Sequence, residues 1–368
     1  MVFKVLFPMT SKGRISAKFI ILILIGLVSF IVPIGIFLNH NQGNCNNKNY
    51  TLPKYVSFKD FDLGFDVSSV VINNSNKTVV GAGNSSEIYI LDLDGKKDYP
   101  TLQTEFNGFR SLALNEEVGH LVAGTLDGSV VLWQSDKSSK NGWSKDYIIF
   151  PERQRKYISS IAISRSGKLI GASSDDTIFI WENSENGNKW ELRYRIFSGH
   201  SGRQVFDLVF GNDDKTLFTV GNDNHTKIWK LDTQDTMKNG DQKDLNNNSL
   251  PINSLVFRAD HNELVLGTNN GKITVWNVKE KPERAEEFIG KHNSQPVNTL
   301  AISEEGKLLV SGSNDNTIKL WNLCTKESFK TLSEHKNWVR SVDISSNQIY
   351  IVSGSLDNKI IIWKREKE

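Results

Sequence analysis

Apolar and polar residues alternate along most of this chain in short runs, and the runs recur in a fixed order. The stretch SGSNDNTIKLWN, residues 311–322, returns almost unchanged as SGSLDNKIIIWK, residues 353–364. The tryptophans that close such runs, spaced 48, 48, 47, 45 and 42 residues apart, are Trp133, Trp181, Trp229, Trp276, Trp321 and Trp363. A further step of 42 residues back from Trp133 reaches Leu91 in a segment of the same shape. The sequence therefore predicts seven units.

Each unit is predicted to contain four strands. A first apolar run, such as VRSVDIS (339–345), precedes a polar turn, a second run, another turn and a third run that ends in tryptophan. Alternation with period two, β-branched residues and turns rich in Gly, Asn and Asp favour strands over helices. Fourth strands are expected at residues 147–150, 192–197 and 327–332. Because one such sheet cannot cover both of its faces, neighbours must stack, which predicts an all-β, seven-bladed propeller of four-stranded antiparallel blades.

The two ends of the repeat region are expected to meet. The sequence runs five residues past Trp363, so the seventh unit has no fourth strand of its own, whereas KYVSF (54–58) is an alternating segment with no unit before it. We expect residues 54–58 to complete the last blade of a propeller spanning residues 54–368. Three polar stretches are expected to be mobile loops, and the last of them obscures a fourth strand. These stretches are residues 134–146, 182–191 and 230–249.

Histidine and aspartate recur at fixed positions around the tryptophans. An aspartate stands six residues before the tryptophan in five units, and a histidine precedes the first strand in three. This arrangement resembles the WD-repeat family, in which His, Ser or Thr, Asp and Trp form a buried hydrogen-bonded tetrad within a blade. The resemblance implies this structural role for His200, Asp223, Trp229, His292, Asp315, Trp321, His335, Asp357 and Trp363.

Several units depart from the family pattern. The first lacks His, Asp and Trp, the second, third and fifth lack the loop histidine, and none has Asp directly after Trp. The turn aspartates could also be imagined as a carboxylate ring for a metal or a sugar. Their repetition from unit to unit favours a role in turns and tetrads, because a buried carboxylate is costly unless hydrogen-bond donors surround it.

Residues 19–38 form an apolar segment with no charge and with Ser29 as its one polar residue. About 20 such residues cross a hydrocarbon core of ~30 Å as a helix, so the segment is predicted to be a transmembrane helix. A cleaved signal peptide is the alternative, but this run exceeds the ~7–15 residues of a signal core and no cleavage site follows. Four basic residues in 1–18, against two in 39–56, predict a cytoplasmic N-terminus. The propeller, beyond the Asn-rich linker 39–53, is then expected on the non-cytoplasmic side.

The body of the chain is slightly acidic. Of 44 basic residues, six lie within residues 1–54, which contain no acid, so the rest of the chain carries 38 basic against 42 acidic residues. Without a basic stripe, this balance argues against a nucleic-acid partner. The two cysteines, Cys45 and Cys324, are too few for a disulfide framework, so stability is expected to come from packing. We expect a monomeric ring, with a Cys45-linked dimer as the less favoured alternative.

No set of residues with catalytic spacing stands out. Three of the seven histidines occupy tetrad positions, and the others have no partner at metal-ligand spacing. The sequence contains no nucleophile elbow, no P-loop and no zinc-protease motif. We therefore expect a protein that is not an enzyme and uses no cofactor or metal.

One face of the ring is the expected binding surface. In WD-repeat proteins this face is lined by the residues that open the first strand and by the residue before the turn aspartate. Carried over by position, the large apolar and arginine residues there are Trp338, Arg340, Leu356, Arg110, Leu126, Tyr157 and Phe206. Such side chains are frequent anchors of protein contacts, although Tyr157 and Phe206 could instead fill gaps between blades.

Two functions remain open from the sequence. The favoured one is a membrane-anchored, non-catalytic scaffold that mediates contacts between proteins through this face. The alternative is an exported propeller enzyme, or a protein that binds a small ligand or carbohydrate in the central channel, which fold alone does not exclude.

Overall fold

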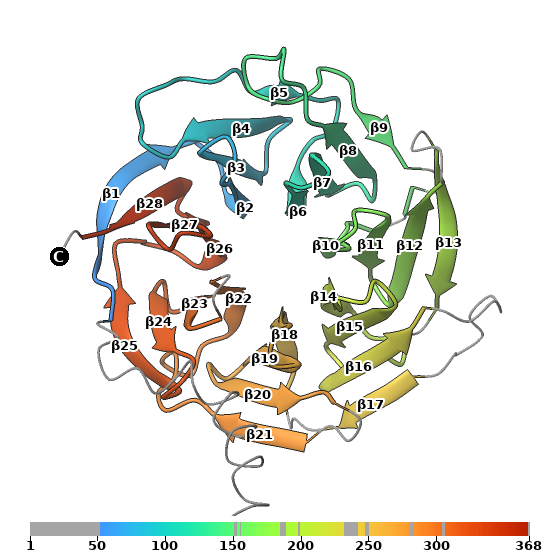
Figure 1. The fold of residues 1–368 in the computed structure, drawn as a ribbon, viewed down its shortest axis with the longest axis vertical. Coiled ribbons are helices and arrows are strands. Elements are labelled where there is room, and N and C mark those ends of the chain that lie inside the picture. The colour runs from blue at the N-terminus through green and yellow to red at the C-terminus, as the bar shows by residue number, and fades with distance from the viewer. Residues whose placement is uncertain are drawn as a thin grey trace, which may run out of the picture. The chain divides into compact units, whose positions relative to one another are not determined.

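The structure, a computed structural model, describes residues 52–150, 153–154, 156–184, 189–197, 199–231, 242–246, 250–279, 283–303 and 306–366. These residues form seven four-stranded antiparallel sheets arranged in a ring around a central channel, which confirms the predicted seven-bladed propeller (Figure 1). Segments 1–18 and 19–38, and the linker up to residue 51, lie outside the described residues. Within the described ranges, no helix is long and apolar enough to cross a membrane.

All blades share one order, with the first strand innermost and the fourth outermost (Figure 1). Blades 1 to 3 are β2 (Val67–Asn73), β3 (Thr78–Gly83), β4 (Glu87–Asp92) and β5 (Leu102–Gln103); β6 (Phe109–Asn115), β7 (His120–Thr125), β8 (Val130–Gln134) and β9 (Ile148–Ile149); and β10 (Ser160–Ile163), β11 (Leu169–Ser174), β12 (Thr177–Asn183) and β13 (Trp190–Ile196). Blades 4 and 5 are β14 (Val205–Phe210), β15 (Thr216–Gly221), β16 (His225–Lys230) and β17 (Gln242–Asn246); and β18 (Ile252–Arg258), β19 (Glu263–Thr268), β20 (Ile273–Asn277) and β21 (Glu283–Glu287). Blades 6 and 7 are β22 (Val297–Ile302), β23 (Leu308–Ser313), β24 (Ile318–Asn322) and β25 (Glu327–Leu332); and β26 (Val339–Ile344), β27 (Tyr350–Ser355), β28 (Lys359–Arg365) and β1 (Tyr55–Asp62).

The turn between the second and third strands explains the recurring Asp-Asn and Asp-Gly pairs. Asn316 and Asn358 have φ angles of 67° and 70°, in the left-handed region that Asn and Gly tolerate best. The aspartate before each closes the turn, since Asp315 accepts the backbone N–H of Thr317 at 3.0 Å. In blades 6 and 7, a short polar side chain and a residue tolerant of positive φ therefore reverse the chain at the same point.

Small residues on the second strand let neighbouring blades approach closely. A Cβ atom added at Gly312 of blade 6 would lie 2.6 Å from a methyl group of Val339 in blade 7. A Cβ atom added at Gly354 of blade 7 would lie at the same distance from Val67 in blade 1. These glycines are required because the first strand of the next blade packs directly on them.

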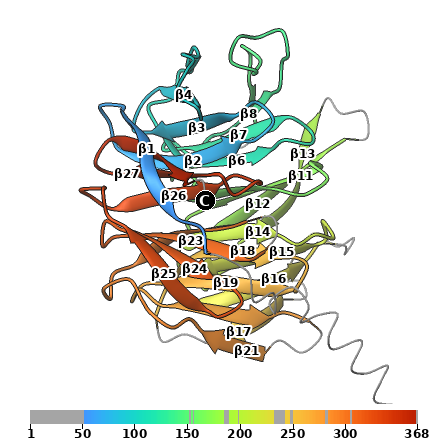
Figure 2. The same ribbon diagram turned by 60° about the vertical axis from the view of Figure 1, so that its left-hand side comes forward.

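Strand β1 closes the ring. It pairs antiparallel with β28, from Tyr55 opposite Arg365 to Asp62 opposite Lys359, and so supplies the fourth strand of blade 7 (Figure 1). Figure 2 brings this side forward and shows β1 passing in front of β26 and β27. Residues 54–58 thus lie where the sequence predicted, and the strand extends four residues farther, to Asp62.

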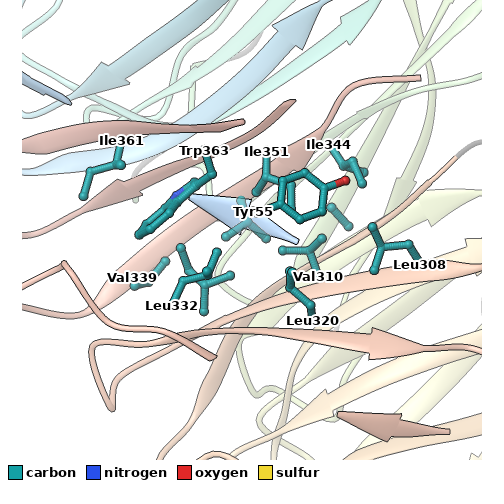
Figure 3. Packing of buried hydrophobic residues seen from close by; sticks show 13 residues of the cluster. Tyr55, Leu308, Val310, Leu320, Leu332, Val339, Ile344, Ile351, Ile361 and Trp363 are labelled. Atoms are coloured by element: carbon teal, nitrogen blue, oxygen red, sulfur yellow. The ribbon is translucent and has the colours of Figure 1, made fainter. Parts of the chain in front are cut away.

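Tyr55 fixes β1 to the core of the closing blade. Its ring is 1% exposed and lies in one hydrophobic cluster with Trp363, Ile351 and Ile344 (Figure 3). Its hydroxyl donates to the backbone carbonyl of Gln348 at 2.7 Å. The seam is therefore held by both a strand pairing and a buried aromatic ring.

All three predicted loops contain ordered structure that the sequence reading missed. The fourth strand of blade 4 is β17, which lies within the stretch 230–249. In the stretch 134–146, Trp143 is buried and joins the cluster between blades 1 and 2. In 182–191, Trp190 opens β13 and packs against Phe150 with ring centroids 5.3 Å apart. Tryptophan in a polar stretch was the signal that could have identified these two anchors.

Candidate functional site: the channel mouth

The seven innermost strands line the channel with side chains in successive layers. Equivalent residues at or next to the start of each first strand form the outermost layer, at the end of the ring where these strands begin. Its residues are Ser68, Arg110, Ser159, Phe206, Asn253, Asn298 and Arg340, and all of them line one cavity of about 590 Å³. We call this layer the channel mouth, and the end of the ring around it the loop face. Sequence equivalence alone therefore brings two arginines to one opening.

The next layer is a belt of hydroxyl and carboxylate groups that join neighbouring blades. A hydroxyl oxygen of one first strand accepts a backbone N–H from the first strand of the next blade. These bonds run from Leu112 to Ser69 (3.0 Å), Ile161 to Ser111 (3.1 Å), Val342 to Thr299 (3.2 Å) and Val70 to Ser341 (3.0 Å). Each such bond contributes about 0.5–1.5 kcal/mol, so the belt ties the blades together around the channel.

Two carboxylates belong to the channel wall, and the sequence reading did not single them out. Asp207 accepts the hydroxyl of Ser160 at 2.7 Å and the backbone N–H of Leu255 at 3.0 Å, so it links three blades. Asp343 accepts the backbone N–H of Ile72 at 2.7 Å. Burial raises the pKa of both carboxyl groups to about 6. An acidic residue at a position where the other repeats place a hydroxyl or a small apolar residue was the available signal.

A polar network covers one side of the mouth. The amide of Gln204 donates to the hydroxyl oxygen of Tyr157 at 2.7 Å and to that of Ser159 at 3.2 Å. The guanidinium of Arg110 lies over the ring of Tyr157, 5.8 Å from its centroid. Tyr157 therefore lines the channel rather than filling a gap between blades, and the half-buried Phe206 lines it as well.

The other predicted face residues surround the mouth on the same end of the ring. Trp338 precedes β26 and is 45% exposed, and Leu126, in the β7–β8 turn, is 42% exposed. Leu356, in the β27–β28 turn, is half-buried and donates its backbone N–H to the carbonyl of Trp338 at 3.0 Å. Large apolar side chains thus lie at the rim in blades 7 and 2, the two blades that supply the arginines of the mouth.

Three blades contain the four-residue network implied by the repeat pattern. In blade 6 the indole N–H of Trp321 donates to the Ser311 hydroxyl at 2.8 Å, and that hydroxyl lies 2.7 Å from Nε2 of His292. Nδ1 of His292 lies 3.0 Å from Asp315. Blade 4 repeats the arrangement with His200, Thr219, Asp223 and Trp229, and blade 7 with His335, Ser353, Asp357 and Trp363.

The tetrad histidines are structural. Burial lowers the pKa of His200 and His292, against the raising effect of their aspartates. A neutral ring that donates from Nδ1 to the carboxylate must accept the hydroxyl proton at Nε2, so both nitrogens are in use. Burial alone would raise the pKa of Asp357, but hydrogen bonds from His335 and a backbone amide lower it to about 2. None of these groups is available to a substrate.

Blades without the loop histidine use hydrophobic packing instead. The position of Ser311 is taken by Ala123 in blade 2 and by Ala172 in blade 3. Among the described residues, the buried indole nitrogens of Trp133 and Trp181 have no hydrogen-bond partner. Aromatic rings surround them, and Phe150, for example, packs against Trp181 with centroids 5.2 Å apart.

The described residues bring together no recognisable reaction chemistry. Across the described ranges, no three His, Cys, Asp or Glu side chains cluster closely enough to hold a metal ion. Outside the tetrads, His225 and His261 each contact one aspartate, Asp244 and Asp260 respectively. Cys45, and with it the predicted Cys45-linked dimer, lies outside the described residues.

Four segments of the chain match the family model of the WD40 repeat (WD domain, G-beta repeat): residues 148–182, 192–230, 286–322 and 326–364. Each begins in the outermost strand of one blade and ends with the third strand of the next, so every matched repeat bridges two blades. The matches include the three blades that hold tetrads.

Curated relatives share the repeats at low identity. The chain is 21% identical over 269 residues to the mouse periodic tryptophan protein 2 homolog, covering 61% of this chain and 28% of that protein. It is 32% identical over 123 residues to an Arabidopsis thaliana WD repeat-containing protein WDS homolog, covering 32% and 22%. It is 22% identical over 123 residues to the Schizosaccharomyces pombe target of rapamycin complex subunit wat1, covering 33% and 36%. The chain thus spans well under half the length of these relatives.

Proposed function

We propose that this WD40-repeat propeller is a scaffold that binds other proteins through its loop face. WD40-repeat proteins are typically non-catalytic interaction scaffolds. One of the similar proteins is a subunit of the target of rapamycin complex, which supports a role within an assembly. The observation that carries the proposal is an exposed Trp338 beside Arg340 on a rigid ring. An aromatic ring and a guanidinium held in fixed positions can bind a partner without losing much conformational entropy.

The loop face differs in chemistry from the opposite end of the ring. Trp338 and Leu126 are exposed at the rim, and Arg110 and Arg340 lie in the mouth. At the opposite end, the turns between first and second strands expose single apolar residues such as Val118 and Ile349. Substitutions on the loop face can therefore test the proposal, and substitutions at the opposite end can serve as the control.

The test compares captured proteins from the native host after mild crosslinking. The loop-face variant combines Trp338→Ala, Arg340→Ala and Arg110→Ala. The control combines Val118→Ala, Arg165→Ala and Ile349→Ala, three exposed residues at the opposite end. We expect the loop-face variant to lose at least one partner that wild type and control retain. If every partner survives the loop-face changes, this surface is the wrong one.

We also propose that residues 19–38 anchor the propeller to a membrane, with the propeller on the non-cytoplasmic side. The support is the sequence alone, an uncharged apolar run preceded by four basic residues. The test is protease treatment of intact cells. The propeller should be cut only when the protease is applied from the non-cytoplasmic side, and protection there with cleavage after cell lysis would refute the orientation.

A further inference from the structure

We infer that the channel mouth binds an anionic group, a carboxylate or a phosphate carried by a segment of a partner protein, between Arg110 and Arg340. This inference rests on the proposed scaffold function and adds the chemistry of what is recognised. The two arginines occupy equivalent positions on β6 and β26, in blades 2 and 7, on either side of Ser68 in blade 1. Both line the same cavity of about 590 Å³, which is wide enough for a side chain but not for a folded domain.

Neither arginine has a counter-charge in the part of the chain that is described. Arg153, Arg193 and Arg258 each pair with a carboxylate within 4 Å, whereas Arg110 and Arg340 form no ion pair or hydrogen bond with another described residue. Burial lowers the pKa of both guanidinium groups. The charge of Arg110 adds to the effect on Arg340, whose pKa falls to about 10. Both remain charged at neutral pH and repel each other, so an anion between them would offset both penalties.

A third donor faces the same space. Because the hydroxyl oxygen of Tyr157 accepts from Gln204, its own proton remains to be donated. In the described part of the chain, no acceptor takes that proton. The contact between Arg110 and the Tyr157 ring also orients the guanidinium. Two forked cations and a phenol match the oxygen atoms of a carboxylate or a phosphate.

Deeper in the channel, the wall rejects an anion. The oxygens of Asp207 and Asp343 already accept backbone N–H groups, and both carboxylates line the cavity. The residues adjoining Asp343 around the ring at the same strand position are apolar, such as Val71 and Ala301. An anion is therefore expected to stop at the layer of the arginines. Such a shallow site suits a group presented by an extended peptide across the loop face.

The experiment uses the full chain and four proteins: wild type, Arg110→Gln, Arg340→Gln and the control Arg165→Gln, which removes one exposed charge from the opposite end. The probes are inorganic phosphate and an array of short peptides whose central residue is phosphoserine, glutamate or alanine. We expect phosphate to raise the melting temperature of wild type and control but not of either mouth variant. We expect an anionic peptide to bind at least about tenfold more tightly than its alanine counterpart, and each mouth variant to lose that preference.

Stability without ligand gives an independent readout. Because each substitution removes one of two repelling charges, Arg110→Gln and Arg340→Gln should melt at or above the wild-type temperature in low-salt buffer without phosphate. Both should then show no shift when the probe is added. A variant that melts well below wild type without ligand would mean that the arginines stabilise the ring through contacts of their own, which contradicts the inference.

The outcomes separate this inference from the scaffold proposal. Peptide binding that depends on the arginines supports both, and phosphate binding without any anionic peptide preference supports the site but assigns it to a free small anion. If no probe binds more tightly to wild type than to the mouth variants, the anion site is wrong, even if the loop-face variant still loses a captured partner. If the probes bind but all captured partners persist in the loop-face variant, the anion site stands and the scaffold proposal fails.

Discussion

Replacing Tyr55 is the sharpest test of how the ring is closed. The side chain is buried at the seam, and its ring packs with Trp363. Loss of a buried aromatic ring costs about 3–5 kcal/mol, because the transfer free energy is lost and a cavity remains. Removing only the hydroxyl costs about 1 kcal/mol, because the carbonyl of Gln348 loses its donor. We therefore expect Tyr55→Ala to lower the free energy of unfolding by about 3–5 kcal/mol and Tyr55→Phe by about 1 kcal/mol.

The assay is urea and thermal unfolding, followed by tryptophan fluorescence. For a ring of this size, the loss in Tyr55→Ala corresponds to a melting temperature lowered by roughly 5–8 °C. Val56→Ala is the matched control, because Val56 lies on the same strand but is 44% exposed, and it should change stability by less than about 0.5 kcal/mol. Hydrogen exchange should also accelerate first in β28, the strand that pairs with β1.

The reasoning would be refuted by equal effects at the two positions. If Tyr55→Ala and Val56→Ala change the melting temperature by the same amount, the buried side chain of Tyr55 does not anchor β1. A loss in Tyr55→Ala without faster exchange in β28 would place the stabilisation elsewhere than at the seam.

Three further changes probe the blades and the channel. Ser311→Ala should cost about 2–4 kcal/mol in urea unfolding, because it orphans the buried indole N–H of Trp321 and Nε2 of His292; a loss below about 0.5 kcal/mol would contradict the tetrad's role. Ala123→Ser offers the blade 2 indole the hydroxyl that it lacks and should stabilise by about 1 kcal/mol, whereas a destabilised variant would show that aromatic packing leaves no room. Because the folded pKa of Asp343 is about 6 against 3.8 in the unfolded chain, its burial penalty grows as pH rises from about 4 to 6. Asp343→Asn should therefore become more stable relative to wild type as pH rises through that window. The gain should be less than about 3 kcal/mol, because the group borders the solvent in the channel. A stability difference between variant and wild type that does not change with pH would argue against the raised pKa.

The number of blades and their strand order could be predicted because both depend on residues that are close together in the sequence. A tryptophan ends the third strand and an Asp-Asn or similar pair forms the turn before it. Both recur at regular intervals, so most blades can be located from the sequence. Blade 1 could be placed without any tryptophan, since Leu91 lies where the spacing requires it and pairs with Val79 as Trp321 pairs with Leu309. The tetrads follow from the same regularity.

Other features depend on contacts between blades and leave little local signal. Strand β17 lies in a polar stretch because an outermost strand buries little of its surface, so no apolar alternation marked it. Asp207 and Asp343 looked like ordinary strand residues, since their partners are backbone amides of the next blade, nearly 50 residues away or at the other end of the chain. Which face residues line the channel and which lie on the rim also depended on the closed ring.

Blade 7 contributes both to closure of the ring and to the proposed anion site. The expected effects on stability and on binding differ enough for mutations to test the two roles separately. Strand β26 carries Arg340, and the same blade is completed by β1. If the free energy of unfolding is about 10 kcal/mol, in the middle of the usual range, a loss of about 3–5 kcal/mol still leaves nearly all molecules folded and closed. Since affinity falls only with the fraction of competent molecules, Tyr55→Ala should lower the melting temperature yet bind an anionic peptide within about twofold of wild type at 25 °C. Arg340→Gln should melt at or above the wild-type temperature but lose its preference for the anionic peptide. If Tyr55→Ala instead loses binding in proportion to its lost stability, the ring opens at β1 often enough to disturb the channel mouth. The loop face would then not be rigid, and the argument for the scaffold that depends on its rigidity would fail.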